Sequence, residues 1–134
     1  MNRIVLDSAA VLAMILKEPG GERVDALLDA LELGADLKVA ISSVNWCEIL
    51  TRMQRDNMEM TAQELSATLS GVELVPFGKA DAELAASYAQ VSQALALGDR
   101  ACLALARTFQ ATAWTADRFW RQCKLDVPIE LLRN

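Results

Sequence analysis

Short apolar segments with strand character alternate with helical segments along the whole chain, and this alternation constrains the fold more than any other feature. The strand-like segments are "RIVL" (3–6), "KVAIS" (38–42), "VELVPF" (72–77), "ATAWTA" (111–116) and "IELL" (129–132). Helical segments cover 8–16, 21–33, 43–56, 61–71, 80–95, 98–109 and 117–123. The alternation predicts α/β layers around a mostly parallel sheet. Because no linker or repeat interrupts the 134 residues, we expect one domain, residues 1–134.

Local signals refine three of these helices. The segment 8–16 is apolar on all sides, which predicts a fully buried helix. Ser42 or Ser43 precedes the helix at 43–56 and is expected to cap it. Thr61 is followed three residues later by Glu64, the spacing of a capping box.

The composition excludes several classes of catalytic and metal site. The chain has no histidine, which rules out histidine bases, Ser-His-Asp and Cys-His nucleophiles, and histidine-bearing zinc sites. Three cysteines without a CxxC spacing indicate neither a zinc site nor a disulfide framework. Cys47 and Cys102 lie in apolar helical runs and are predicted to be small core residues.

No segment is predicted to enter a membrane, and the chain is expected to be cytoplasmic. Asp7 interrupts the apolar N-terminal run, and the following "KEPGGE" offers no small-residue cleavage site for a signal peptide. No apolar run approaches the roughly 18 residues of a membrane span. Scattered, unpaired cysteines agree with a reducing compartment.

The charge is distributed unevenly. The net charge is −5, which argues against nonspecific binding of nucleic acid by bulk charge. Residues 1–99 hold 7 basic and 15 acidic side chains, whereas residues 100–134 hold 6 basic and 3 acidic ones. The last quarter therefore forms either a basic patch or a set of solvated helix faces, built from Arg100, Arg107, Arg118, Arg121 and Lys124.

Three acidic residues stand where strands end or helices begin. Asp99, in "LGDRACLALA", lies on the apolar face of its helix, and a buried carboxylate is costly unless it caps, is paired or binds a metal. Asp7 and Asp117 each follow a strand directly. The carboxyl ends of parallel strands meet at one rim, where ligands bind in open α/β sheets. Each acid also fits a helix N-cap, so a shared acidic site and three separate caps both remain open at this point.

A shared carboxylate site would suit a hard divalent cation. Mg²⁺ and Mn²⁺ prefer carboxylate and water oxygens, and such a site activates water and neutralises charge in phosphodiester hydrolysis. Other phosphate sites do not fit. "GVELVPFGK" has the wrong glycine spacing for a P-loop, no GxGxxG occurs, and Ala9 denies the Asp-x-Asp of dehalogenase-type phosphatases.

Four segments follow one another along the chain: "IVLDSAAVLAMILKEPGGERV", "SSVNWCEIL", "LGDRACLALA" and "AWTADRFW". In this order and spacing they resemble the PIN-domain family and, within it, the VapC-type toxins of toxin–antitoxin pairs. The resemblance covers essentially the whole chain. It implies a five-stranded parallel sheet between helices and a metal-dependent ribonuclease that a small antitoxin neutralises.

The resemblance also assigns the site. The four family acids fall on Asp7, Glu48, Asp99 and Asp117, with Asp7 and Asp99 as the chief ligands of Mg²⁺ or Mn²⁺ and the other two acting directly or through water. Glu48 comes only from the resemblance; by helical periodicity alone it is a solvated side chain at the edge of a polar face. One departure is that Ala9 stands where family members often carry a hydroxyl, with Ser8 one place earlier.

The expected partners are an RNA substrate, a small antitoxin and a second copy of the chain, with no membrane. Arg100 and Arg118 each follow a site acid, and either contact RNA phosphate or form a salt bridge to a neighbouring acid. The tryptophans are expected in the core or at an interface. Two other functions remain open: a catalytically weak binding subunit of a toxin–antitoxin complex on DNA, which Ala9 would favour, and a small metal-dependent nucleotide hydrolase.

Overall fold

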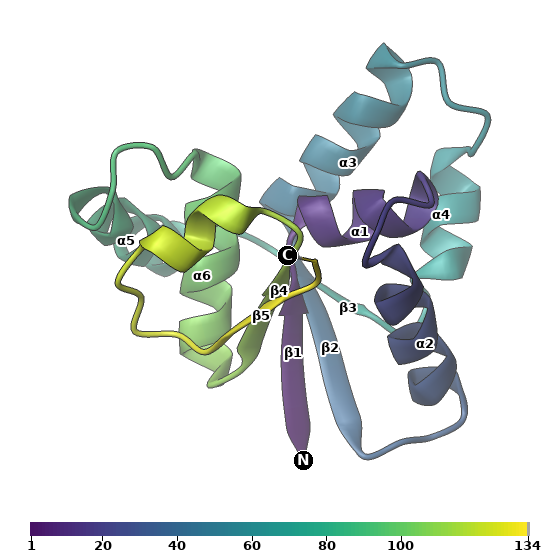
Figure 1. Ribbon diagram of the computed structural model, residues 1–134, viewed down its shortest axis with the longest axis horizontal. Coiled ribbons are helices and arrows are strands. Elements are labelled where there is room, and N and C mark those ends of the chain that lie inside the picture. The colour runs from purple at the N-terminus through teal and green to yellow at the C-terminus, as the bar shows by residue number, and fades with distance from the viewer. Residues whose placement is uncertain (134) are drawn as a thin grey trace.

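The computed structural model describes residues 1–133 and contains, within them, five strands, six α-helices and two 3₁₀ helices (Figure 1). The strands are β1 (Asn2–Leu6), β2 (Leu37–Ser42), β3 (Glu73–Val75), β4 (Thr112–Thr115) and β5 (Ile129–Leu131). The α-helices are α1 (Ser8–Ile15), α2 (Gly21–Glu32), α3 (Ser43–Arg55), α4 (Ala62–Thr68), α5 (Lys79–Ser87) and α6 (Leu97–Phe109). The 3₁₀ helices are η1 (Tyr88–Gln90) and η2 (Arg118–Gln122).

The five strands form one sheet in the order β3-β2-β1-β4-β5, and every neighbouring pair is parallel. This confirms the predicted α/β architecture. Ile4 of the central strand β1 lies opposite Val39 of β2 and Thr112 of β4. The chain first runs outward from β1 through β2 to β3, then returns to β4 on the other side of β1. The strand order therefore reverses between β1 and β4, and a crevice opens at the carboxyl ends of strands at such a point.

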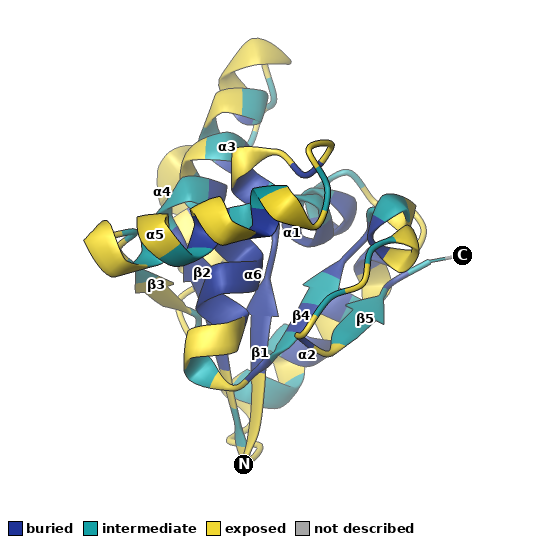
Figure 2. Cartoon of the chain, turned by 90° about the vertical axis from the view of Figure 1, so that its left-hand side faces the viewer, coloured by how far each residue is buried: buried dark blue, intermediate teal, exposed yellow. Residues whose placement is uncertain are grey.

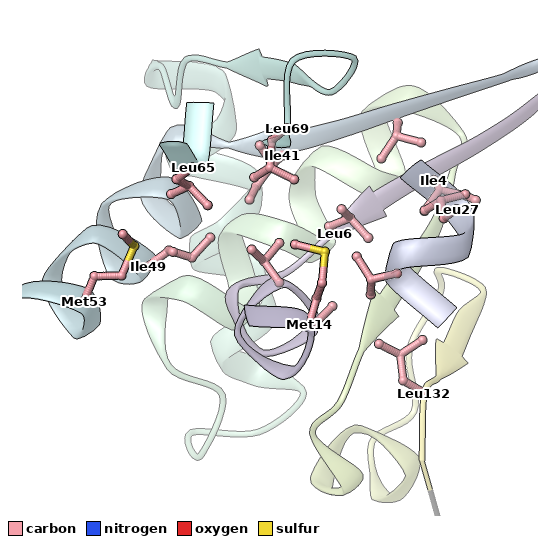
Figure 3. Close-up of a cluster of buried hydrophobic side chains, with 14 residues drawn as sticks. Ile4, Leu6, Met14, Leu27, Ile41, Ile49, Met53, Leu65, Leu69 and Leu132 are labelled. Atoms are coloured by element: carbon pink, nitrogen blue, oxygen red, sulfur yellow. The ribbon is translucent and has the colours of Figure 1, made fainter. Parts of the chain in front are cut away.

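Helices cover both faces of the sheet, and each face has its own core (Figure 1). Because successive strand residues point to opposite faces, Ile4 and Leu6 join the core under α1, α2, α3 and α4, whereas Val5 joins the core under α6. Figure 3 shows the first of these cores, with Leu6 and Ile41 from the sheet beside Met14 and Ile49 from α1 and α3. Figure 2 shows α6 as mostly buried and α5 as largely exposed.

Several local predictions are confirmed. Ser42 caps α3, its hydroxyl accepting from the Val44 amide at 3.2 Å. Thr61 and Glu64 form the capping box of α4. None of the helices within residues 1–133 combines the length and the hydropathy required to span a lipid bilayer.

Three details differ from the sequence-based expectation. Cys47 is exposed rather than in the core, because the buried stripe of α3 is Asn45, Ile49 and Met53, and a residue two positions after Asn45 points to the other side of the helix. The segment 8–16 is not fully buried. Since α1 packs one side against the sheet, Ala10, Val11, Ala13 and Met14 are buried, whereas the other residues are half-buried. The helix expected over 80–95 ends with η1, beyond which the Ser92 hydroxyl accepts from the Ala94 amide, a local bond that competes with helix.

Candidate active site

Asp7 lies at the carboxyl end of β1, where the strand order reverses. It follows β1, caps α1 and is 2% exposed. Its carboxylate accepts from the Ala10 amide at 2.7 Å and from the Thr115 hydroxyl on β4. The capping interpretation is thus confirmed, and it does not exclude a further role, because the carboxylate sits at the carboxyl ends of both central strands.

The pKa of Asp7 is raised to about 7. Burial is the largest cause, and the nearby charges of Asp99 and Asp117 raise it further, while the hydrogen bonds from Thr115 and Ala10 lower it. Near neutral pH the carboxyl is therefore partly protonated. A bound cation would favour the charged carboxylate instead.

Asp99 is the third residue of α6, not its N-cap, because the helix begins at Leu97 and Ala96 is the cap residue. Its Oδ2 accepts from the Ala96 amide at 2.9 Å, which is the reciprocal half of a capping box. Its Oδ1 accepts from the Trp120 indole Nε1 at 3.3 Å. Burial first, and then the charges of Asp117 and Glu48, raise the pKa of Asp99.

Asp117 follows β4 at the same edge of the sheet. It caps η2, accepting from the Phe119 amide at 2.9 Å, and its own amide donates to the Thr115 hydroxyl oxygen at 3.0 Å. Thr115 is fully buried, and because its hydroxyl also bonds to the Asp7 carboxylate, it bridges Asp7 and Asp117. This hydroxyl ties two of the acids at fixed positions on neighbouring strands.

Glu48 reaches the rim from α3 and is half-buried, not a solvated side chain. Its Oε1 accepts from the Ser8 hydroxyl and from Asn45 Nδ2, both at 2.9 Å. Its carboxylate lies so close to Gly98 that a Cβ at that position would overlap with it. Contacts from α1, α3 and α6 thus hold Glu48 beside the start of α6.

The four predicted acids lie at one rim of the sheet and influence one another electrostatically. The charges of Asp99 and Asp117 act on Asp7, and those of Asp117 and Glu48 act on Asp99. Within residues 1–133, no three acidic or cysteine side chains converge into a ready metal cage. The donor set consists of carboxylate oxygens alone, and it fits a hard divalent cation that would relieve the mutual repulsion.

The predicted basic residues differ in their burial and in whether they pair with an acid. Arg107 pairs with Asp126 at 2.7 Å, away from the acids. Arg118, Arg121 and Lys124 are exposed on η2 and the segment after it. Arg100 is half-buried, and its Nε has no hydrogen-bond partner in the described chain. Neither Arg100 nor Arg118 forms an ion pair within residues 1–133.

A groove with a volume of ≈ 780 Å³ runs from Glu48 along α3. Ser8, Glu48 and Gly98 form its end at the acids, and Arg52 and Arg55 line it farther along α3. Both arginines pair with Asp56, so together these three side chains leave one net positive charge in the groove. The groove reaches the acidic rim at Glu48.

Five residues that contact the acids were not predicted as part of a site: Ser8, Asn45, Gly98, Thr115 and Trp120. Trp120 is fully buried, as a core position for the tryptophans predicts, but its indole also holds Asp99. Asn45 left a signal in the sequence, because it precedes Glu48 by three residues and so shares its helix face. Thr115 contacts Asp117 locally, two residues along the chain, whereas Ser8, Gly98 and Trp120 meet Glu48 or Asp99 through tertiary contacts.

Comparison with known proteins gives one family and one recurring fold. The family model described as "PIN domain" matches residues 4–124. Comparison with curated protein sequences found no match.

Solved structures that resemble the chain include VapBC2 from Rickettsia felis bound to a promoter DNA fragment, with a TM-score of 0.72, 19% identity, and coverage of 96% of this chain and 97% of that chain. FitAcB from Neisseria gonorrhoeae has a TM-score of 0.65, 21% identity and coverage of 96% and 97%. A toxin–antitoxin complex from Klebsiella pneumoniae has a TM-score of 0.63, 20% identity and coverage of 85% and 86%. At these identities the likeness establishes the fold.

Proposed function

Because this chain belongs to the PIN domain family, we propose that it is a Mg²⁺- or Mn²⁺-dependent endoribonuclease, the toxin of a toxin–antitoxin pair. The observation that carries the proposal is Asp7, a carboxylate 2% exposed at the carboxyl end of β1, under the charges of Asp99 and Asp117. A cap alone does not account for two further acids nearby. A site for a divalent cation does.

The four acids divide into two pairs in the proposed reaction. Asp7 and Asp99 would bind the cation directly, while Glu48 and Asp117 would bind it directly or through water. The chemistry that Mg²⁺ or Mn²⁺ supplies is Lewis acidity, which makes water a better nucleophile and offsets the charge that develops on the phosphodiester. Thr115 and Trp120 keep Asp7 and Asp99 in fixed orientations through their hydrogen bonds.

RNA is the proposed substrate, and basic side chains beside the acids support it. Arg118 is exposed directly after Asp117, and the half-buried Arg100 directly follows Asp99; neither forms an ion pair within residues 1–133. We propose that both contact backbone phosphates flanking the cleaved bond. The exposed Arg121 and Lys124 extend the same charge along and beyond η2.

The proposed partners are a small antitoxin and a second copy of the chain, and the proposed compartment is the cytoplasm. The similar solved structures support the first of these, since the Klebsiella pneumoniae structure is described as a toxin–antitoxin complex and the Rickettsia felis one as VapBC2 on promoter DNA. An antitoxin that occupies the rim would exclude RNA from the acids.

Mapping of RNA 5′ ends in cells tests the proposed activity. After a brief pulse of expression, the wild type is expected to create a few discrete 5′-phosphate ends that Asp7→Ala/Asp99→Ala does not create. Glu59→Ala, which removes an exposed acid after α3, is the matched control and should cut like the wild type.

The other outcomes favour different functions. A folded, antitoxin-free chain that creates no new ends would favour the DNA-binding subunit, and Ala9→Ser would then be the first reversion to make. Hydrolysis of free mononucleotides without cleavage of RNA would favour the nucleotide hydrolase.

A further inference from the structure

Asn45 stands between α3 and α6 at the acidic rim. Its side chain is fully buried, and its Nδ2 donates to Glu48 Oε1 at 2.9 Å and to the Gly98 carbonyl at 3.0 Å. One amide group therefore links a predicted cation ligand on α3 to the first turn of α6, where Asp99 lies one residue farther on.

The chemistry of its partners fixes the orientation of this amide. The Gly98 carbonyl and the Glu48 carboxylate both accept hydrogen bonds, so the amide nitrogen must face them. The opposite orientation would place Oδ1 against two acceptors. As a consequence, Oδ1 faces elsewhere and has no hydrogen-bond partner in the described chain. A buried acceptor without a partner is costly, and an apolar residue of similar shape avoids that cost.

Gly98 completes the arrangement from the opposite side. A Cβ at this position would overlap with the Glu48 carboxylate, so the absence of a side chain lets that carboxylate lie against the α6 backbone. Ser8 adds a second donor to Glu48 Oε1 at 2.9 Å. With Oε1 engaged by two donors, the direction of the remaining oxygen, Oε2, is set.

We infer that Asn45 is a positioning residue, which holds Glu48 against Gly98 so that the Glu48 carboxylate is oriented for the cation. This role rests on the proposed function. A hydrogen bond from Asn45 to the Gly98 carbonyl would be enough to link α3 to α6 for stability. The second hydrogen bond, to Glu48, holds the one acid that α3 contributes to the rim. Partners that orient metal ligands in this way commonly change metal affinity by 10–100-fold when they are removed.

Calorimetric titration with Mn²⁺ at pH 8, paired with urea unfolding in EDTA, separates orientation from stability. For Asn45→Leu we expect Mn²⁺ affinity at least about 10-fold below that of the wild type. Ser42→Ala is the matched control, because it weakens the cap of the same helix without touching Glu48. It should lower the urea midpoint and leave Mn²⁺ affinity within about twofold of the wild type.

Each outcome of the titration supports or overturns the positioning role of Asn45. Binding of Mn²⁺ by Asn45→Leu as tightly as by the wild type would overturn the positioning role alone. An equal loss of affinity in Ser42→Ala would overturn it too, because general loosening of α3 would then explain the effect. Absence of Mn²⁺ binding by the wild type would overturn the proposed function and this role with it. If Asn45→Leu does not fold, the same titration on Asn45→Ala gives the answer.

Discussion

Asp7→Asn is expected to stabilise the metal-free protein at pH 8 and to abolish its stabilisation by Mn²⁺. Ionising a carboxyl that is 2% exposed and lies near Asp99 and Asp117 costs folding free energy, and asparagine removes that charge. Its Oδ1 can still accept from the Ala10 amide, and its Nδ2 can donate to the Thr115 hydroxyl. We expect a gain of about 1–3 kcal/mol in EDTA by urea unfolding.

The pH dependence of the same two proteins gives an independent check. The pKa of Asp7 is raised from 3.8 to about 7, so the folded state holds its proton more tightly than the unfolded state does. The free energy of unfolding of the metal-free wild type should therefore fall as pH rises from about 4 to about 7, by on the order of 4 kcal/mol at most from this group. In Asp7→Asn that part of the slope should disappear.

Addition of Mn²⁺ should close or reverse the difference in stability between the two proteins. At 100 times its dissociation constant, Mn²⁺ should add about 2.7 kcal/mol to the wild type and nothing to Asp7→Asn. If Asp7→Asn is instead destabilised in EDTA and still responds to Mn²⁺, then Asp7 is only the cap of α1.

Gly98→Ala is expected to impair the site while the fold survives. Alanine at the second position of α6 favours the helix by up to about 1 kcal/mol. Its Cβ, however, would overlap with the Glu48 carboxylate, which must then leave its hydrogen bonds with Ser8 and Asn45. Since these effects oppose one another, we expect stability within about 1 kcal/mol of the wild type. RNA cleavage and Mn²⁺ affinity should fall at least about 10-fold.

The double variant Gly98→Ala/Glu48→Ala identifies the cause. Without the Glu48 carboxylate the new Cβ has room, so Gly98→Ala should stabilise the Glu48→Ala protein by up to about 1 kcal/mol, as helix propensity dictates. The difference between the effects of Gly98→Ala in the two backgrounds is measured by urea unfolding. Full Mn²⁺ affinity in Gly98→Ala would show that the position of Glu48 against α6 does not matter.

The α/β architecture and three of the four candidate acids were predictable from local sequence. Alternation of strands and helices predicts parallel pairing, which brings the residues after the strands to one rim, but only the observed strand order places β1 beside β4 and so brings Asp7 near Asp117. Asp99 was visible as an acid on an apolar helix face. Its exact place, the third residue of α6 rather than the cap, was not, because helix ends shift by a residue or two.

Glu48 shows the limit of local reasoning. A helical wheel puts it at the edge of a polar face, and only a family resemblance assigned it to the site. The contacts that bury it come from Ser8 on α1 and Gly98 on α6, residues 40 and 50 positions away along the chain. The same holds for Cys47, whose exposure depends on which side of α3 the neighbouring helices cover.

The sequence by itself therefore determined the parallel α/β architecture and the acids that are candidates for a site, because hydrophobic periodicity is a local property of the chain. The tertiary structure decided the strand order, which places β1 beside β4. The tertiary structure alone decided how Glu48 is held, which way the Asn45 amide faces and why position 98 has no side chain. These depend on the approach of α3 to α6, and that approach is set by packing between segments more than fifty residues apart.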